Sequence, residues 1–383
     1  MTGGKHQLAA AQLAASEKLV VKVGSSLLCG ETGALRDAWL ATLAADIDAL
    51  RKKGGQVIVV SSGAVAIGRA RLGLEGALRL EEKQAASAAG QAALIGAWQA
   101  AFDPFGTQTA QVLLTLDDTE HRRRYLNARA ALSALLELGA LPVINENDTV
   151  ATSEIRYGDN DRLAAHAAQL LRADTLVILS DVEGLFSADP RRSANAAHID
   201  FVEEVTPEIE RMAEGENRIA GVGSGGMASK LAAAKIAARA GCATIIAPGV
   251  ADHPLEALMQ GGRSTLVAAA RNVEGARRQW IFGKLKAAGV ITIDAGAAKA
   301  LRGGASLLPA GVVNVEGDFA RGDTVSIRSA DGALLGQGLC AYDSTDMRKI
   351  AGVRSERIEE ILGYRRRPAI VEKDELVLSV EKT

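Results

Sequence analysis

The sequence predicts an α/β fold with a mainly parallel sheet, followed by a small β-rich domain. Short apolar runs alternate with helical stretches through the first two-thirds of the 383 residues. That alternation is typical of a parallel sheet with helices on both faces. Beyond about residue 288, short alternating strands separated by glycine and aspartate turns replace it. We therefore expect a three-layer α/β/α sandwich and a second, barrel-like domain.

The expected strands of the first domain are nearly continuous apolar runs, as in strands buried on both faces. They cover Leu19–Val23, Gln56–Ser61, Thr109–Leu114, Leu141–Asn145, Thr175–Ser180, Ala243–Ala247 and Ser264–Val267. Helical patterns lie between them, over Ala34–Lys53, Glu81–Ala101, Tyr125–Leu138, Asp161–Leu171 and Met227–Ala240. The second domain shows strand patterns at Val290–Ile293, Val312–Val315, Thr324–Arg328 and Leu334–Leu339.

These patterns divide the chain into four parts. Residues 1–18 form an N-terminal extension, 19–270 the α/β domain, 271–288 a charged linker, and 289–383 the β-rich domain with a C-terminal tail. A net charge of −2 argues against a dedicated nucleic-acid binder. Three scattered cysteines indicate a reducing compartment. Neither a signal peptide nor a membrane-spanning run is visible, so we expect a cytoplasmic protein.

The run Gly223–Lys230 is the strongest indication of a binding site. Its three glycines precede the start of a predicted helix, where free backbone N–H groups favour an anion such as phosphate. The spacing Gly221-x-Gly223-x-x-Gly226 matches a dinucleotide fingerprint, but the preceding residues 207–220 are charged and helix-like rather than a strand. A Walker A loop is also excluded, because Lys230 does not directly follow the last glycine.

Other polar groups follow the predicted strands, where ligands bind in open parallel sheets. Lys22 precedes a Gly-Ser-Ser turn, and Ser62 and Gly63 open a predicted helix, so both places suit an anion. An edge lysine and a plain helix cap are the alternatives. The clusters 145–148 and 158–161 are rich in amides and carboxylates and together suit a zwitterion. The second cluster also suits a cationic group or a metal-bound phosphate, and a turn and a helix cap are the alternatives. Ser180 and Asp181 lead into a turn that suits a nucleotide, or is an ordinary β-turn.

The chemistry that these groups favour needs no general base. The five histidines show no metal-ligand spacing, and no nucleophile elbow is present. A carboxylate substrate, with a pKa near ~4.3, is already an ionised nucleophile at neutral pH. Positioning and charge neutralisation by two lysines, backbone amides and Mg²⁺ would then suffice for phosphoryl transfer.

In this order, the motifs resemble the amino acid kinase family and, within it, the glutamate 5-kinases. Residues 289–366 resemble the PUA domain that many of these enzymes carry, through residues 291–297 and 306–311. The resemblance covers nearly the whole chain after about the first 17 residues. Ser180 and Ser224 stand where threonine is common, and both retain the hydroxyl group.

The resemblance implies ATP-dependent phosphorylation of the γ-carboxylate of L-glutamate to γ-glutamyl phosphate, the first step of proline biosynthesis. It implies three groups of residues. The catalytic group is Lys22, Lys230 and Asp161. The ATP-binding group is Lys22, Ser180, Asp181, Ser224, Gly225, Gly226, Met227, Ala228, Ser229 and Lys230. The glutamate-binding group is Ser62, Gly63, Asn145, Asp148 and Asn160. Mg²⁺ would be held mainly by the nucleotide phosphates, with no protein metal site.

Relatives of this kind suggest a homo-oligomer, a dimer or tetramer. The labile acyl phosphate favours transfer to a glutamate-5-semialdehyde dehydrogenase. The nearest alternative is a kinase of the same fold acting on acetylglutamate, aspartate, carbamate or a nucleoside monophosphate. RNA binding by the PUA domain is a second alternative, disfavoured by 15 Lys and Arg against 14 Asp and Glu in residues 281–383. A regulatory domain with an inactive site is the third, and the two lysines argue against it.

Overall fold

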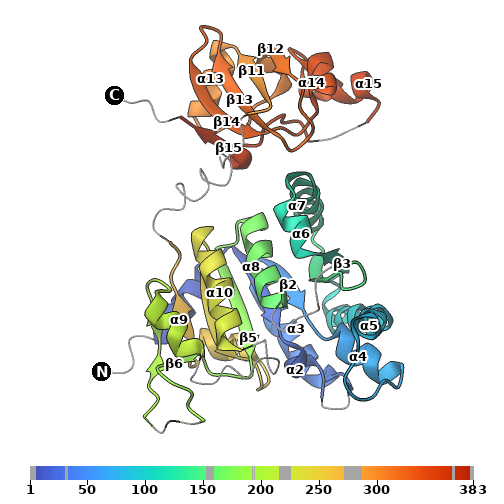
Figure 1. Cartoon of the computed structure of the whole chain (residues 1–383), viewed down its shortest axis with the longest axis vertical. Coiled ribbons are helices and arrows are strands. Elements are labelled where there is room, and N and C mark those ends of the chain that lie inside the picture. The colour runs from blue at the N-terminus through green and yellow to red at the C-terminus, as the bar shows by residue number, and fades with distance from the viewer. Residues whose placement is uncertain are drawn as a thin grey trace. The chain divides into compact units, whose positions relative to one another are not determined.

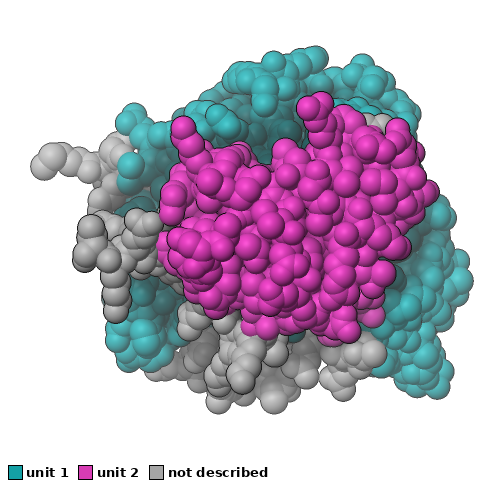
Figure 2. Space-filling view, turned by 90° about the horizontal axis from the view of Figure 1, so that it is seen from above, with its two compact units in different colours: residues 1–120, 128–271 teal, residues 121–127, 272–383 magenta. Residues whose placement is uncertain are grey.

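A computed structural model describes residues 6–30, 33–151, 159–191, 193, 195–214, 226–270, 287–364 and 367–379. The chain divides into two compact units, which Figure 2 colours separately: residues 1–120 with 128–271, and residues 121–127 with 272–383. The domain limits expected from the sequence stay a prediction. Of the expected linker 271–288, residues 271–286 lie outside the described residues.

The first sheet contains eight strands in the order β3-β4-β2-β1-β5-β9-β10-β8. Six neighbouring strands, β3 to β9 in that order, run parallel, and β10 pairs with β9 antiparallel. The strands are β1 (Lys18–Val23), β2 (Gln56–Ser61), β3 (Thr109–Leu114), β4 (Leu141–Glu146), β5 (Thr175–Ser180), β8 (Phe201–Val202), β9 (Ala243–Pro248) and β10 (Thr265–Val267). The predicted mainly parallel sheet is confirmed.

Helices cover both faces of this sheet. Helices α8 and α10 lie side by side on one face, and α3 lies on the other (Figure 1). The α-helices of this part of the chain are α1 (His6–Ala14), α2 (Ser25–Leu28), α3 (Asp37–Lys52), α4 (Ala64–Arg71), α5 (Leu80–Phe102), α6 (Leu116–Glu120), α7 (Arg122–Glu137), α8 (Asp159–Leu171), α9 (Pro207–Glu214), α10 (Met227–Arg239) and α11 (Pro254–Met259). The expected three-layer architecture is therefore confirmed.

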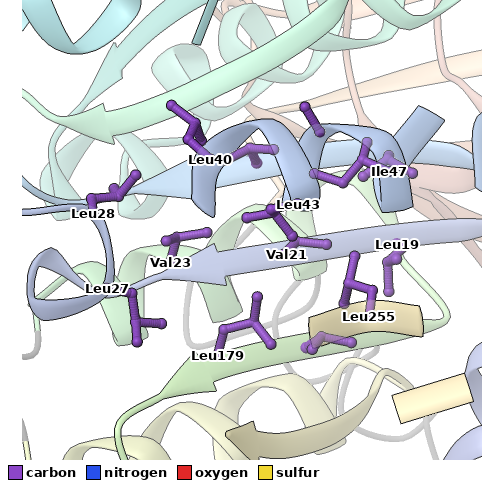
Figure 3. Packing of buried hydrophobic residues seen from close by; sticks show 14 of the residues in the cluster. Leu19, Val21, Val23, Leu27, Leu28, Leu40, Leu43, Ile47, Leu179 and Leu255 are labelled. Carbon is purple, nitrogen blue, oxygen red and sulfur yellow. The ribbon is translucent and has the colours of Figure 1, made fainter. Parts of the chain in front are cut away.

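Strand β1 separates the two helical layers. Alternate side chains of β1 pack in one apolar cluster with α3, as Figure 3 shows for Leu19, Val21, Val23, Leu40, Leu43 and Ile47. Successive side chains of a strand point to opposite faces, so Val20 and Lys22 face the layer of α8 and α10. A lysine is thereby placed inside the protein, 6% exposed, near the carboxyl end of a central strand.

Some elements were not expected from the sequence. Within residues 1–18, the predicted extension, α1 contributes Ala9 and Leu13 to the main apolar cluster, and Gln12 donates a hydrogen bond to Thr175. Strands β6 (Leu185–Phe186), β7 (His198–Ile199) and β8 are two residues long. Two residues cannot show a period of two, so the sequence pattern could not predict them.

The second unit has its own sheet and core. Its five strands have the order β12-β11-β13-β14-β15, with β11 parallel to β13 and the other pairs antiparallel. They are β11 (Gly289–Ile293), β12 (Val312–Gly317), β13 (Thr324–Ser329), β14 (Leu334–Leu339) and β15 (Leu376–Leu378), with helices α13 (Ala295–Arg302), α14 (Ser344–Ile350) and α15 (Ile358–Leu362). The predicted separate β-rich domain with short helices is confirmed.

Two glycines let α4 and α5 cross in backbone contact. A Cβ atom at Gly68 would lie 1.7 Å from the carbonyl oxygen of Ala86, and one at Gly90 would lie 1.9 Å from that of Ala64. Backbone carbonyls cannot yield to such overlaps without moving a helix. The crossing therefore fixes α5 relative to the first turn of α4.

Replacing Gly90 with alanine should lower the free energy of unfolding by at least about 2 kcal/mol, because the new methyl group would push the two helices apart. Gly96 of the same helix is the matched control, since a Cβ there would meet nothing within 4 Å. Gly96→Ala should raise stability by about 0.5–1 kcal/mol through helix propensity. Urea unfolding of both variants tests this, and equal effects at the two positions would contradict the tight crossing.

Candidate active site

The carboxyl ends of β1, β2, β4 and β5 open into one large cavity. Its volume is about 2280 Å³, whereas sites for one small molecule are roughly 300–1,000 Å³. The strands are parallel and in register, Val23 beside both Ser61 and Leu179. Residues that follow different strands are thereby brought to one edge of the sheet. The cavity has room for two substrates.

Most of the residues singled out in the sequence line this cavity. They are Lys22, Ser62, Gly63, Asn145, Asp148, Asn160, Asp161, Ser180, Asp181, Gly226, Met227 and Lys230. Ala228 and Ser229 are described but do not line it. Ser224 and Gly225 lie outside the described residues, so the structure says nothing of them.

A buried carboxylate between two buried lysines forms the centre of the site. Lys22 Nζ lies 2.6 Å from Asp161 Oδ1, and Lys230 Nζ lies 3.4 Å from Asp161 Oδ2. The side chains are 8%, 7% and 0% exposed for Lys22, Lys230 and Asp161. We call these three residues the lysine–aspartate group. It carries a net charge of +1 when all three members are ionised, which suits an anionic ligand in the cavity.

Burial and the neighbouring charges both shift the pKa values of Lys22 and Asp161. Burial lowers the pKa of Lys22, and the charge of Lys230 lowers it further, while Asp161 partly offsets both effects. Burial alone would raise the pKa of Asp161, but the two lysines outweigh it and hold that pKa below its usual value. Asp161 therefore stays an anion, and Lys22 loses its proton more easily than a surface lysine.

Three different elements supply the lysine–aspartate group. Lys22 comes from β1, Asp161 from the first turn of α8, and Lys230 from the first turn of α10. An aspartate in the first turn is favoured by the helix dipole. Ser229 donates a hydrogen bond to Asp161 Oδ2 over 3.2 Å, so it contacts the carboxylate rather than the cavity.

The start of α10 offers backbone donors to the cavity. Gly226 precedes the helix in an extended conformation, and no side chain in the described part caps it. Orphan N–H groups at a helix start bind anions. The predicted helix start at Met227 is confirmed. The helix-like character of residues 207–220, which argued against a dinucleotide fingerprint, is confirmed by α9 for residues 207–214.

Ser62, Asn160 and Asp148 form a further part of the cavity lining. Asn160 Nδ2 donates a hydrogen bond to Ser62 Oγ over 3.0 Å, and Asn160 Oδ1 is buried without a hydrogen-bond partner among the described residues. Asp148 Oδ2 accepts a hydrogen bond from Ser87. The helix-cap alternative for Ser62 is wrong, because α4 is capped by Gly63, at φ 111°, without a side-chain bond. Only glycine adopts this φ readily.

Several cavity residues were missed in the sequence. Arg69, Lys83, Arg191 and Arg263 also line the cavity, and Arg263 forms an ion pair with Glu183 at 2.7 Å. No motif marks isolated basic residues, so the sequence gave no reason to single them out. Ser87 was missed as well, although a lone hydroxyl inside an alanine-rich helix was a visible irregularity.

The described residues contain one group of side chains that could together hold a metal ion: Asp46, His253 and Glu256. Asp46 already accepts hydrogen bonds from His253 Nδ1 and from two backbone N–H groups of α11. None of the three residues lines the cavity. In the cavity, both oxygens of Asp161 face lysines. The Asp161 carboxylate is therefore already engaged by cations and is a poor ligand for a metal ion.

Comparison with known proteins identifies the family of this chain. The model of the amino acid kinase family matches residues 17–248, more than half of the chain, and the model of the PUA domain matches residues 289–362. The chain belongs to the amino acid kinase family. The predicted resemblance is confirmed, and the residues that line the cavity lie within the matched region, apart from Arg263.

Curated relatives in this family resemble nearly the whole chain. The glutamate 5-kinase of Caulobacter vibrioides (strain NA1000 / CB15N) is 56% identical over 93% of this chain and 95% of its own length. The glutamate 5-kinase of Paramagnetospirillum magneticum is 54% identical over 96% of this chain and 99% of its own length. Glutamate 5-kinase 1 of Rhizobium meliloti is 53% identical over 94% of this chain and 92% of its own length. The similarity to these relatives thus extends over the second unit as well.

No helix among the described residues has both the length and the apolar character needed to cross a membrane.

Replacing Asp161 with asparagine should lower the free energy of unfolding at pH 7 by about 3–5 kcal/mol, because two buried ammonium groups lose their counter-ion. Without the carboxylate, the pKa of Lys22, which burial already lowers, falls further, so the unfolded chain binds more protons than the folded one. Stability then rises with pH, and the deficit relative to the wild type shrinks from pH 7 toward 10.

Asp48→Asn is the control for this substitution. Asp48 is also buried, but its partner Lys52, at 2.7 Å, is 72% exposed, so its loss should cost about 1 kcal/mol or less. Urea unfolding of both variants between pH 7 and 10 supplies the comparison. A deficit for Asp161→Asn that did not change with pH would contradict a charge-based role for Asp161.

Proposed function

We propose that this protein transfers the γ-phosphoryl group of ATP to the γ-carboxylate of L-glutamate, giving γ-glutamyl phosphate and ADP, the first step of proline biosynthesis. The glutamate 5-kinases that it resembles at 53–56% identity support this function. The observation that carries it is the lysine–aspartate group at the edge of the sheet. It places two cations beside a cavity large enough for a nucleotide and an amino acid.

Lys22 and Lys230 neutralise the charge on the phosphoryl group in transfer. Charge spreads over its equatorial oxygens in the transition state, so the protein mainly has to position and neutralise. Asp161 holds both ammonium groups from the opposite side and keeps them from repelling each other. No histidine lies among the described residues of the cavity, and a carboxylate acceptor needs no base to remove a proton.

The ATP side of the cavity is formed by the start of α10 and the end of β5. Backbone N–H groups beginning at Gly226 and Met227 would hold the phosphates, together with Lys22 and Lys230. Ser180 donates a hydrogen bond to Asp181 over 3.1 Å, which fixes that carboxylate beside the nucleotide. Ser224, Gly225, Ala228 and Ser229 complete the proposed ATP-binding run.

The glutamate side is formed by the ends of β2 and β4 and the start of α8. The Ser62 hydroxyl and the Gly63 N–H group are donors for a substrate carboxylate. Asp148 and the unpartnered Asn160 Oδ1 are acceptors for the substrate ammonium group, and Asn145 lines the same wall. A buried acceptor without a partner is costly unless a ligand satisfies it. This arrangement matches the two charges of an amino acid.

Mg²⁺ would be held mainly by the nucleotide phosphates, and it would neutralise charge as the phosphoryl group is transferred. Asp161 already contacts its two lysines, so we expect the metal ion to depend on the phosphates rather than on this carboxylate. We also propose a cytoplasmic homo-oligomer that passes its labile product to a glutamate-5-semialdehyde dehydrogenase.

The substrate can be identified by trapping the acyl phosphate with hydroxylamine. With ATP and Mg²⁺, we expect a hydroxamate from L-glutamate and at least tenfold less from N-acetylglutamate, aspartate or carbamate, because only glutamate fills both charged positions and places its γ-carboxylate at the lysines. ADP release with nucleoside monophosphates as acceptors completes the comparison. The absence of a glutamate-dependent hydroxamate would refute the proposed function.

Lys22→Ala and Lys230→Ala should each lower kcat by about 10²–10³-fold while the protein stays folded, because each removes a charge that acts on the transition state. Lys235→Ala is the matched control. It lies on the same helix as Lys230, but its ammonium group pairs with Glu210 at 2.6 Å outside the cavity, so its kcat should stay within about twofold of the wild type. Near-normal turnover in either cavity-lysine variant would count against the roles assigned here.

A further inference from the structure

Helix α5 makes two hydrogen bonds to the segment that follows β4. Ser87 Oγ donates to Asp148 Oδ2 over 2.6 Å, and Gln84 Nε2 donates to the carbonyl oxygen of Ala151 over 3.3 Å. Ser87 is 1% exposed and Asp148 is 6% exposed. One helix therefore holds both the backbone and the carboxylate of this segment.

The contact of Ser87 is unusual for a serine inside a helix. Such hydroxyl groups commonly bond back to a carbonyl in the preceding turn. Ser87 instead reaches a carboxylate 61 positions further along the chain. Its neighbours on both sides are alanines, which offer no alternative donor at this place. A hydroxyl–carboxylate bond of this length is charge-assisted and strong.

Helix α5 is itself fixed to α4, which also contributes to the glutamate side of the cavity. The close crossing at Gly68 and Gly90 joins α5 to α4, whose first turn starts at Gly63 in the cavity wall. Ser87 lies between these contacts, directly after Ala86, whose carbonyl oxygen meets Gly68. The hydroxyl group therefore stands on a helix whose position relative to the glutamate side is set by backbone contacts.

We propose that Ser87 is a positioning residue that orients the Asp148 carboxylate toward the ammonium group of the substrate. This rests on the proposed function, in which Asp148 binds that group. By holding Oδ2, Ser87 fixes the plane of the carboxylate before the substrate arrives. Pre-organisation of this kind lowers the cost of binding. Ser87 thereby favours amino acids over dicarboxylates that lack an amino group.

The test compares L-glutamate with glutarate, which has both carboxylates but no ammonium group. Ser87→Ala should raise KM for glutamate roughly tenfold, since a hydrogen bond to a charged group is lost. Its kcat and its KM for ATP should stay within about twofold. The preference for glutamate over glutarate in kcat/KM should fall by the same factor as KM rises.

Thr109→Val is the matched control. It removes another buried hydroxyl bonded to α5, in this case to Gln99 over 2.8 Å, at the far end of β3 from the cavity. Its substrate preference should equal that of the wild type, even if its unfolding midpoint falls. In the Asp148→Asn background, Ser87→Ala should change KM for glutamate by less than about twofold, because the two residues act through one contact.

Three results would overturn the proposal. An unchanged preference in an active Ser87→Ala variant would remove the role of Ser87 and leave the proposed function standing. Equal rises in KM for glutamate and ATP, with a lower unfolding midpoint, would mean that Ser87 only supports the fold. A wild-type protein that forms no γ-glutamyl phosphate would refute the proposed function itself, and this proposal with it.

Discussion

The ion pairs between Asp161 and the two lysines are the interaction on which the rest of the site depends. Two ammonium groups are buried within reach of one carboxylate, at 2.6 and 3.4 Å. Without it, two ammonium groups would be buried with no counter-ion, which is costly. One anion for two cations leaves a net positive charge, which a phosphate can neutralise. The cost of burying the lysines is thus offset fully only when an anionic substrate is bound.

The fold supplies this arrangement through its parallel sheet. Lys22 points to the opposite face of β1 from the apolar cluster on α3, so the strand contributes both a core and a cation. The starts of α8 and α10 meet at the carboxyl end of the sheet and bring Asp161 and Lys230 to it. On the glutamate side, the backbone crossing of α4 and α5 fixes the helix that carries Ser87. Strands and helices carry the lysine–aspartate group, whereas Ser62, Asp148 and Asp181 lie in the segments that follow their strands.

The sequence predicted the fold well because the longer strands of the first sheet are separate apolar runs with helical stretches between them. It predicted much of the cavity wall because parallel strands bring the residues after them to one edge. It could not show that Ser229 contacts Asp161 or that Ser87 contacts Asp148, since hydrogen bonds between distant residues leave no pattern. The crossing at Gly68 and Gly90 could not be predicted either, because a contact between two helix backbones leaves no pattern in the sequence. Short strands such as β6 lack any period.

The central claim is that Lys22 and Lys230 act together on one phosphoryl group. A crystal structure with MgADP, tetrafluoroaluminate and L-glutamate tests it most directly, because the fluoroaluminate occupies the place of the group in transfer. This account predicts that both Nζ atoms lie within about 3 Å of its fluorine atoms, with Asp161 still in contact with both lysines. A structure in which either lysine stayed on Asp161 alone, away from the fluoroaluminate, would contradict it.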